Sequence, residues 1–296
     1  MQFVDLHSHS TASDGTLAPA EVAKLALRAG LSGWALTDHD TIGGVAEAAD
    51  ESARLGIDFL PGIEISAEYA HPGTMHILGY GIDVHSSVLH DLTRRLIEGR
   101  DNRNPKIVKK LQELGVAISM NEVENEAGGT VVGRPHIAAI LHRKGYVSSI
   151  KDAFNKYLAP GGAAYFDKER LSPRRALEMI IDSGGIPVLA HPFQLRCESD
   201  EKLESVVREL IDLGLAGIEV MHSDHTPDLV SKYTALVDRL GLLKTGGSDF
   251  HGPGVHPTML GERYVPYESV ERLKALAATR HGKTPPAFAL PPPVEE

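Results

Sequence analysis

The chain has 296 residues, of which 42% are apolar and 24% charged, so it is long enough for one large hydrophobic core or two smaller ones. The net charge of −10 argues against a protein that coats nucleic acid or binds a DNA duplex, and the single cysteine excludes an internal disulfide framework. No apolar run approaches ~18 residues, and no basic segment followed by an apolar one opens the chain, so we expect a cytoplasmic protein with no membrane partner.

The first part of the chain alternates between short apolar runs and amphipathic segments. The pattern predicts strands over 2–6, 33–37, 57–65 and 75–80, and helices over 19–29 and 45–55. Pro19 near the start of the first helix, and Gly30 and Gly56 just behind the two helices, are typical of helix boundaries. Pro61 and Gly62 predict a break within the third strand.

The middle of the chain does not alternate. It predicts helices over 88–99, 105–114, 135–144 and 150–158. Residues 93–175 hold 16 of the 30 Lys and Arg but only nine of the 40 Asp and Glu, which makes a basic segment inside an acidic chain. Such a segment suits an anionic ligand, although a solvated helical surface explains the same charge. We predict an inserted helical, basic subdomain over 86–175 that caps the substrate.

The alternation then resumes. It predicts strands over 186–190, 217–221 and 243–246, and helices over 201–213, 227–240 and 270–278. Strands that alternate with helices predict parallel βα units, either closed into a barrel or left as an open sheet. We expect an α/β fold in which residues 1–85 and 176–285 form one discontinuous βα domain, followed by a proline-rich tail over 286–296.

Histidines and acidic residues gather at the ends of the predicted strands. They are His7, His9 and Asp14 after the first strand, Asp38, His39 and Asp40 after the second, Glu64 and His76 in the next two, His191 and His222 after the fifth and sixth, and Asp249 and His251 after the seventh. Because the carboxyl ends of parallel strands share one face, we expect these side chains to converge. A single histidine there is more often structural, but helix capping does not explain so many strand ends.

The kinds of side chain indicate what this convergence could hold. Imidazole and carboxylate ligands without thiolate suit Mn, Zn or Fe, and they argue against a purely structural zinc site. The donors outnumber what one ion can use, so we predict two or three divalent ions, with Glu64 available as a bridge. Closely spaced ions activate water and stabilise the attacking and leaving oxygens, which favours hydrolysis, above all of a phosphoester.

Six motifs occur in this order along the chain: HSHSTASDG, ALTDHDTI, GIEIS, HILGY, LAHP and GGSDFH. In this set and order the chain resembles the polymerase-and-histidinol-phosphatase (PHP) family of metal-dependent phosphoesterases. The resemblance implies a distorted barrel of seven βα units and a centre of two or three metal ions, with Mn favoured over Fe or Zn. It implies as ligands His7, His9, Asp14, His39, Glu64, His76, His191, Asp249 and His251.

Within the family, the chain looks most like a short bacterial branch with a helical insertion after the HILGY-like strand. Members of that branch remove the 3′-phosphate from nucleoside 3′,5′-bisphosphates, and some trim short RNA from the 5′ end. The basic insertion suits such a bis-anionic nucleotide. Its RDNRNP and GRPH stretches supply Arg100, Asn102, Arg103, Arg134 and His136 as substrate-binding candidates, because the arginine fork matches phosphate oxygens. Arg103 and Arg134 are the strongest of these candidates.

Asp40 and His222 also lie at strand ends but are not part of this ligand set. Either could supply or position the proton that the leaving group needs, and His222 is favoured by its intrinsic pKa. Asp40 could instead hold a sugar hydroxyl.

Three other functions remain as alternatives. A histidinol-phosphatase-like or other phosphomonoesterase would use the same centre. An amidohydrolase that cleaves C–N bonds also begins with H-x-H on a βα barrel, but we find no lysine of the kind that usually bridges its metals. A nonenzymatic nucleotide sensor or RNA-binding module predicts binding without turnover, and a basic insertion without clustered aromatics fits RNA stacking poorly.

Overall fold

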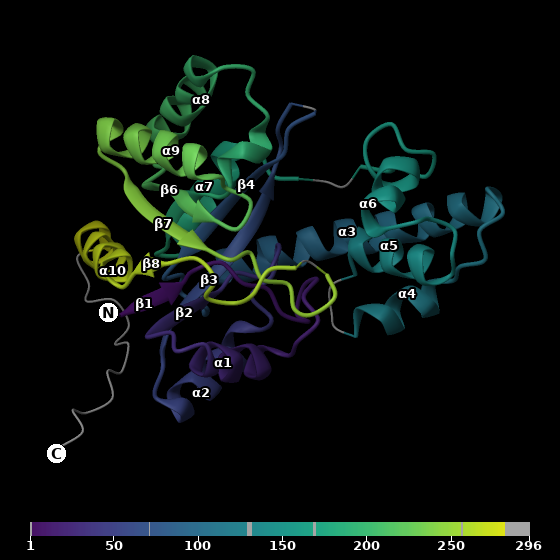
Figure 1. Cartoon of the computed structure of the whole chain (residues 1–296), viewed down its shortest axis with the longest axis horizontal. Coiled ribbons are helices and arrows are strands. Elements are labelled where there is room, and N and C mark those ends of the chain that lie inside the picture. Colours follow the sequence, from purple (N-terminus) through teal and green to yellow (C-terminus); the bar gives the residue numbers. More distant parts are fainter. Residues whose placement is uncertain (1, 71, 129–131, 168–169, 256, 282–296) are drawn as a thin grey trace.

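The structure is a computed structural model that describes residues 2–70, 72–128, 132–167, 170–255 and 257–281. It consists of a sheet surrounded by helices and of a second group of helices that projects to one side (Figure 1). The tail predicted over 286–296 lies outside the described residues. Within the described ranges, no helix is both long and apolar enough to cross a membrane.

The sheet curls into a nearly closed barrel. Its strands in the described part of the chain are β1 (Phe3–Asp5), β2 (Gly33–Leu36), β3 (Asp58–Ala67), β4 (Met75–Tyr80), β5 (Ile186–Leu189), β6 (Gly217–His222), β7 (Leu243–Gly247) and β8 (Val265–Pro266). They follow the order β7-β6-β5-β4-β3-β2-β1-β8. The Leu6 amide donates to the Gly246 carbonyl at 3.1 Å, so the end of β1 also meets β7. The expectation of an α/β fold with a distorted barrel is confirmed, and the short strand β8 adds an eighth strand beside β1.

One strand of the barrel runs against its neighbours. Strand β4 is antiparallel to both β3 and β5, whereas β1, β2 and β3 pair in parallel, as do β5, β6 and β7. The prediction of parallel units throughout is wrong here, because residues 68–74 are too few for a helical crossover. The predicted break at Pro61 and Gly62 is also wrong. Strand β3 is continuous, and these two residues mark where its pairing passes from β2 to β4.

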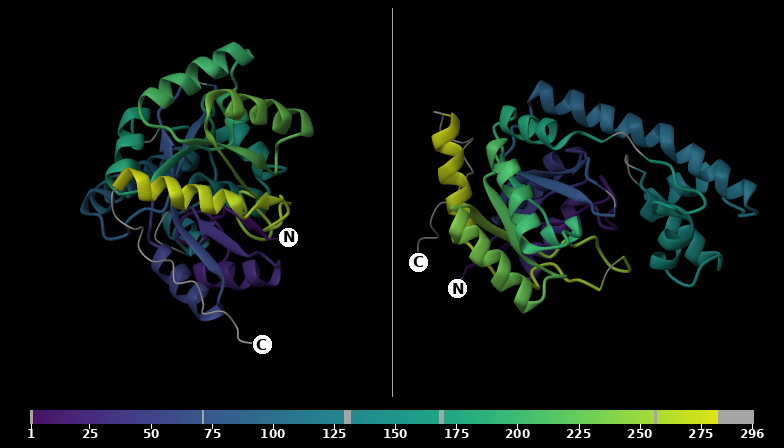
Figure 2. Two further views of the ribbon diagram at one scale, coloured as in Figure 1. Left: turned by 90° about the vertical axis from the view of Figure 1, so that its left-hand side faces the viewer. Right: turned by 90° about the horizontal axis from the view of Figure 1, so that it is seen from above.

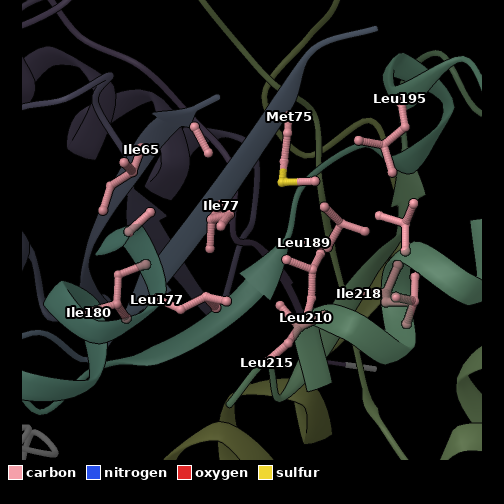
Figure 3. Close-up of a cluster of buried hydrophobic side chains, with 14 of the residues drawn as sticks. Ile65, Met75, Ile77, Leu177, Ile180, Leu189, Leu195, Leu210, Leu215 and Ile218 are labelled. Carbon is pink, nitrogen blue, oxygen red and sulfur yellow. The ribbon is translucent and has the colours of Figure 1, made fainter. Parts of the chain in front are cut away.

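Helices pack around the outside of the barrel. They are α1 (Pro19–Arg28), α2 (Val45–Leu55), α7 (Pro173–Asp182), α8 (Asp200–Asp212), α9 (Pro227–Leu240) and α10 (Glu268–His281). Ile77 of β4 and Leu189 of β5 pack in one cluster with Leu177 of α7 and Leu210 of α8 (Figure 3). Leu78, the next residue of β4, points the opposite way and joins a second cluster between the strands and α10. Apolar alternation along the strands therefore fills both layers.

A helical insertion lies between β4 and α7. It comprises α3 (Ser87–Glu113), α4 (Met120–Ala127), α5 (Arg134–Arg143), α6 (Ile150–Ala153) and the π-helical turn η1 (Phe154–Leu158). These helices enclose a hydrophobic cluster of their own, drawn from residues 107–164. Helix α3 links the two parts, because Leu89 belongs to the barrel cluster and Leu111 to the insertion cluster. Figure 2 shows α3 running from the barrel to the far side of the insertion.

Two predictions for the insertion differ from the structure. The helices predicted over 88–99 and 105–114 are the single helix α3, with Pro105 inside it. Proline removes one backbone hydrogen bond, but the buried side chains of Leu96 and Ile107 hold the helix to its neighbours on both sides of the proline. Helix α4 was not predicted, although Ser119 and Glu122 form a capping box, which is a recognisable start signal.

Candidate metal centre

The barrel brings the predicted strand-end residues to one place. His7 and His9 follow β1 and point to the same side of an extended segment, and Ser8 between them forms a bridge with Phe250 behind β7. His39, behind β2, forms a bridge with Glu64 of β3. The loop that follows β7 lies on the side of the barrel that faces the inserted helices (Figure 1). The strand ends and the insertion thus face each other.

Glu64 lies at the centre of this convergence and is fully buried. Its Oε1 is 2.9 Å from His76 Nδ1 and 2.9 Å from His191 Nε2. Its Oε2 is 2.9 Å from His39 Nδ1 and 3.4 Å from the Nε2 atoms of both His7 and His9. One carboxylate therefore contacts five imidazoles, which four strands (β1, β2, β4 and β5) position, as a bridging ligand would.

The donor atoms fall into overlapping groups. Within the described residues, four sets have ligand atoms that all lie within 4.8 Å of one another: His9, Asp14, His39 and His251; His7, His9, Glu64 and Asp249; His7, Glu219 and His222; and His39, Glu64 and His76. The sharing of His9 and Glu64 between sets means that ions held by them would be close neighbours. His191 joins the cluster through Glu64. All nine residues named as ligands from the resemblance lie in this one cluster.

The cluster also contains buried polar atoms that a divalent cation could bind. His7 Nε2, His9 Nδ1 and His191 Nδ1 are buried without a hydrogen-bond partner among the described residues, beside the carboxylate of Glu64. A buried polar atom without a partner is destabilising by about 1–3 kcal/mol. A cation among these nitrogen and oxygen atoms removes that penalty, and the donor set suits Mn, Fe or Zn.

Charges within the cluster shift its pKa values strongly. Burial alone would raise the pKa of Glu64, but the facing histidines, His39 first, hold it well below the usual value. Burial lowers the pKa of His9 to about 3, with a further contribution from neighbouring His251. His9 is therefore neutral at pH 7, which is the form that binds a metal. Burial would also lower the pKa of His251, but Asp14 and Asp249 raise it to about 10.

Glu219 of β6 is a functional candidate that the sequence did not reveal. It is fully buried, its Oε1 accepts from His7 Nδ1 at 2.8 Å, and its Oε2 accepts from the His191 amide at 2.7 Å. It thereby orients His7 so that Nε2 faces Glu64, the arrangement of a carboxylate that supports a metal-bound histidine. The only sequence signal is an acidic residue inside the apolar run GIEVM.

The two residues considered for proton transfer have different surroundings. His222 Nε2 is 3.4 Å from Asp249 Oδ2, and its Nδ1 accepts from the Asp224 amide at 3.0 Å, so the neutral ring carries its proton on Nε2. The carboxylate of Asp40 is fully buried and accepts from the Ser66 amide at 2.8 Å and from Ser66 Oγ at 3.1 Å. Asp40 thus holds the loop behind β2 to β3, and its part in proton transfer or sugar binding stays a prediction.

The predicted substrate-binding residues lie on the insertion. Asn102 is exposed on α3, and the neighbouring Arg103 is buried with its guanidinium against Asn104 Oδ1. Arg134 begins α5. Its Nη1 donates to the Leu158 carbonyl at 2.8 Å, and its guanidinium lies over the rings of Phe154 and Tyr165, at 5.9 Å and 5.6 Å from the ring centres. Two further candidates complete the set: His136, whose Nδ1 accepts from the Gly133 amide, and Arg100, whose side chain is outside the described part.

Comparison with known proteins assigns the chain to a family. The model of the PHP domain matches residues 5–223. The chain is 36% identical to a 3′,5′-nucleoside bisphosphate phosphatase of Chromobacterium violaceum, over 86% of this chain and 89% of that protein. It is 33% identical to the 5′-3′ exoribonuclease Rnm of Escherichia coli, over 84% of this chain and 85% of that protein.

The fold comparison agrees with the sequence comparison. A solved structure of an amidohydrolase from Chromobacterium violaceum, with bound sulfate and no metal, superimposes with a TM-score of 0.83 at 34% identity. The superposition covers 94% of this chain and 96% of that one. Together with the match over residues 5–223, these similarities show that the chain belongs to the PHP family.

Proposed function

We propose that this chain is a metal-dependent phosphatase that releases the 3′-phosphate of nucleoside 3′,5′-bisphosphates, and that it also trims short RNA from the 5′ end. The observation that carries the proposal is the buried cluster of nine histidines and carboxylates, in which eight residues surround the shared carboxylate of Glu64 on the side that faces the insertion. Divalent ions there, Mn before Fe or Zn, would supply positive charge and an activated water.

The chain's own residues would divide the remaining work. The imidazoles and carboxylates around Glu64 hold the ions, and Glu219 keeps His7 in the correct orientation. Water would add to phosphorus as the bond to the 3′ oxygen breaks; one proton of the water would stay with the phosphate and the other would pass to the 3′ oxygen, which the Nε2–H of His222 would position by a hydrogen bond. The products are a nucleoside 5′-phosphate and inorganic phosphate.

The insertion would hold the second phosphate. The Arg134 guanidinium is fixed by the Leu158 carbonyl and by two aromatic rings, so little conformational freedom would be lost when an anion binds it. Asn102, Arg103 and His136 lie on the same group of helices and are proposed to assist. A substrate with two phosphates would then span from the barrel to the insertion.

Release of inorganic phosphate by the Mn-loaded protein, and release of nucleoside 5′-monophosphate from the RNA, test the proposal. The substrates are adenosine 3′,5′-bisphosphate, 5′-AMP, L-histidinol phosphate and a short 5′-phosphorylated RNA, each with and without chelator. We expect chelator-sensitive release from the bisphosphate and no release from 5′-AMP. Release from histidinol phosphate alone would contradict the substrate, and no release from any of the four would direct attention to amides or to a sensor role.

Arg134→Lys tests the proposed anion site on the insertion. Lysine keeps the charge but loses the planar fork, so KM for the bisphosphate should rise about tenfold or more with little change in kcat. Arg143→Lys is the matched control, because Arg143 lies at the other end of α5, is 57% exposed and pairs with Glu126. Equal KM values for the two variants would remove Arg134 from the proposal.

A further inference from the structure

Asp5, the last residue of β1, is a fully buried carboxylate that does not face the candidate metal centre. Its Oδ1 accepts from the His7 amide at 3.1 Å and from the Ser248 amide at 3.0 Å. Its Oδ2 accepts from the Gly261 amide at 2.8 Å. One side chain thus holds three chain segments together: the segment that carries His7, the residue before Asp249, and the loop that follows β7.

The packing around Asp5 leaves little freedom for these segments. Gly247, at the end of β7, lies against the His7 amide, and a Cβ atom on it would come within 2.7 Å of Asp5 Oδ1. Two candidate ligands, His7 and Asp249, therefore keep their separation through backbone contacts with Asp5. The His7 Nε2 to Asp249 Oδ1 distance is 3.3 Å.

Asp38 makes a comparable set of contacts on another side of the centre. It is fully buried, and its carboxylate accepts from the Ser10 amide at 2.8 Å, from Ser10 Oγ at 2.7 Å and from Ser13 Oγ at 2.6 Å. These contacts fix the loop that carries His9 and Asp14. Asp38 thus supports the group of His9, Asp14, His39 and His251, whereas Asp5 supports the group of His7, His9, Glu64 and Asp249.

We propose that Asp5 and Asp38 are positioning residues that separately set the affinities of two different ion sites, each by fixing the backbone of one ligand group. The inference rests on the metal centre of the proposed function, but not on its substrate. Partners of this kind typically change metal affinity by about 10–100-fold without contacting the ion.

Metal retention tests the proposal without substrate. Wild type, Asp5→Asn, Asp38→Asn and the double variant are loaded with Mn²⁺ and dialysed against graded chelator buffers, and bound metal per chain is measured by mass spectrometry. Each single variant should lose one equivalent at a free Mn²⁺ concentration about 10–100-fold higher than that at which wild type loses it, and the double variant should lose two. Loss of the same single equivalent in all three variants, or wild-type retention in Asp5→Asn, would overturn the proposal.

Asp58→Asn is the matched control for general destabilisation. Asp58 begins β3 at the opposite end of the strand from Glu64 and interacts with Tyr267 and Lys274. It should lower the melting temperature but retain metal like wild type. Metal loss in this variant equal to that of Asp5→Asn would assign the effect to stability and overturn the proposal. A wild type that binds no ion would instead overturn the metal centre itself.

Hydrogen exchange on the wild type covers the case in which Asp5→Asn does not fold. Peptides that contain the amides of His7, Ser248 and Gly261 should exchange slowly in the metal-free protein, because Asp5 already holds them. Fast exchange that becomes slow only after metal is added would show that the metal, and not Asp5, orders these segments.

Discussion

Glu64 is one side chain that lies within 3.4 Å of five imidazoles of the cluster. In Glu64→Gln, an NH2 group takes the place of one ligand oxygen. We expect bound metal to fall below one equivalent and phosphate release to fall more than ~100-fold, since even residues behind the ligands cost about 10–100-fold. Metal analysis and the phosphate assay measure both effects.

Glu68→Gln is the control for this change. Glu68 follows β3 four residues after Glu64 and is exposed. It should behave like wild type in both measurements. Full metal content in Glu64→Gln would show that this carboxylate is no ligand.

The titration of His251 predicts how pH affects the metal-free protein. Burial opposes its protonation, but Asp14 and Asp249 raise its pKa from 6.5 to about 10. His7 and His222 shift in the same direction. Between these pH values the folded His251 keeps a proton that the unfolded chain has released, so stability is fully present below pH 6.5 and falls as pH rises toward 10.

Thermal melts of chelator-treated protein from pH 6.5 to 9 test whether stability falls as pH rises. The melting temperature should fall with pH in the wild type and fall less in His251→Gln. Added Mn²⁺ should reduce or reverse the trend, because a metal binds the deprotonated imidazole. A melting temperature of the metal-free wild type that rises with pH would contradict the assignment.

Some residues of the candidate metal centre can be predicted from the sequence, and others cannot. His7, His39 and Asp249 can be found because they follow strands, and strand ends converge whatever the details of packing. Glu219 cannot be found in this way, since one acidic residue in an apolar run has no spacing that marks it. Whether a carboxylate faces the imidazoles of the candidate centre, as Glu64 does, or holds a backbone, as Asp40 does, depends on side-chain directions that only the fold supplies.

At the scale of elements, helix α3 contributes to two separate hydrophobic clusters, one in the barrel and one in the insertion. We therefore predict that the two parts can be perturbed separately. Leu111 is fully buried in the insertion cluster, and its truncation to alanine should be destabilising by about 2–5 kcal/mol. The substitution lowers the stability of the insertion and not that of the barrel. Leu111→Ala should therefore raise KM for the bisphosphate while the metal content of the barrel stays unchanged. Chemical denaturation, metal analysis and kinetics measure the three quantities.

Leu114→Ala is the matched control, because Leu114 ends the same helix and is 45% exposed. Its effect on stability should stay within about 0.5 kcal/mol. Metal loss in Leu111→Ala would show that the insertion also supports the centre in the barrel.

The same elements show where sequence patterns stop being informative. The bounds of α2 and β4 agree with prediction, because apolar periodicity and flanking glycines mark them locally. Helix α3 continues through Pro105 because two separate cores hold its halves, which is long-range information. The antiparallel direction of β4 likewise follows from how it pairs with β3 and β5, and its residues carry no sign of it.

On the scale of the whole molecule, the hydrophobic residues divide into clusters around the barrel and one cluster within the insertion. Helix α3 and the segment that leads from η1 to α7 connect the two parts. The candidate ligands all belong to the barrel, while the proposed anion site belongs to the insertion. A protein built in this way need not unfold in one step.

Calorimetry should therefore show two thermal transitions, only one of which responds to metal. Mn²⁺ at about 100 times its dissociation constant adds about 2.7 kcal/mol to the part that binds it, which should raise the barrel transition by roughly 5–10 °C. The insertion transition should stay in place with metal and should move to lower temperature in Leu111→Ala. A single transition that shifts in both experiments would mean that α3 couples the two parts into one folding unit. The proposed anion site and the ion sites would then unfold together, with one free energy of unfolding.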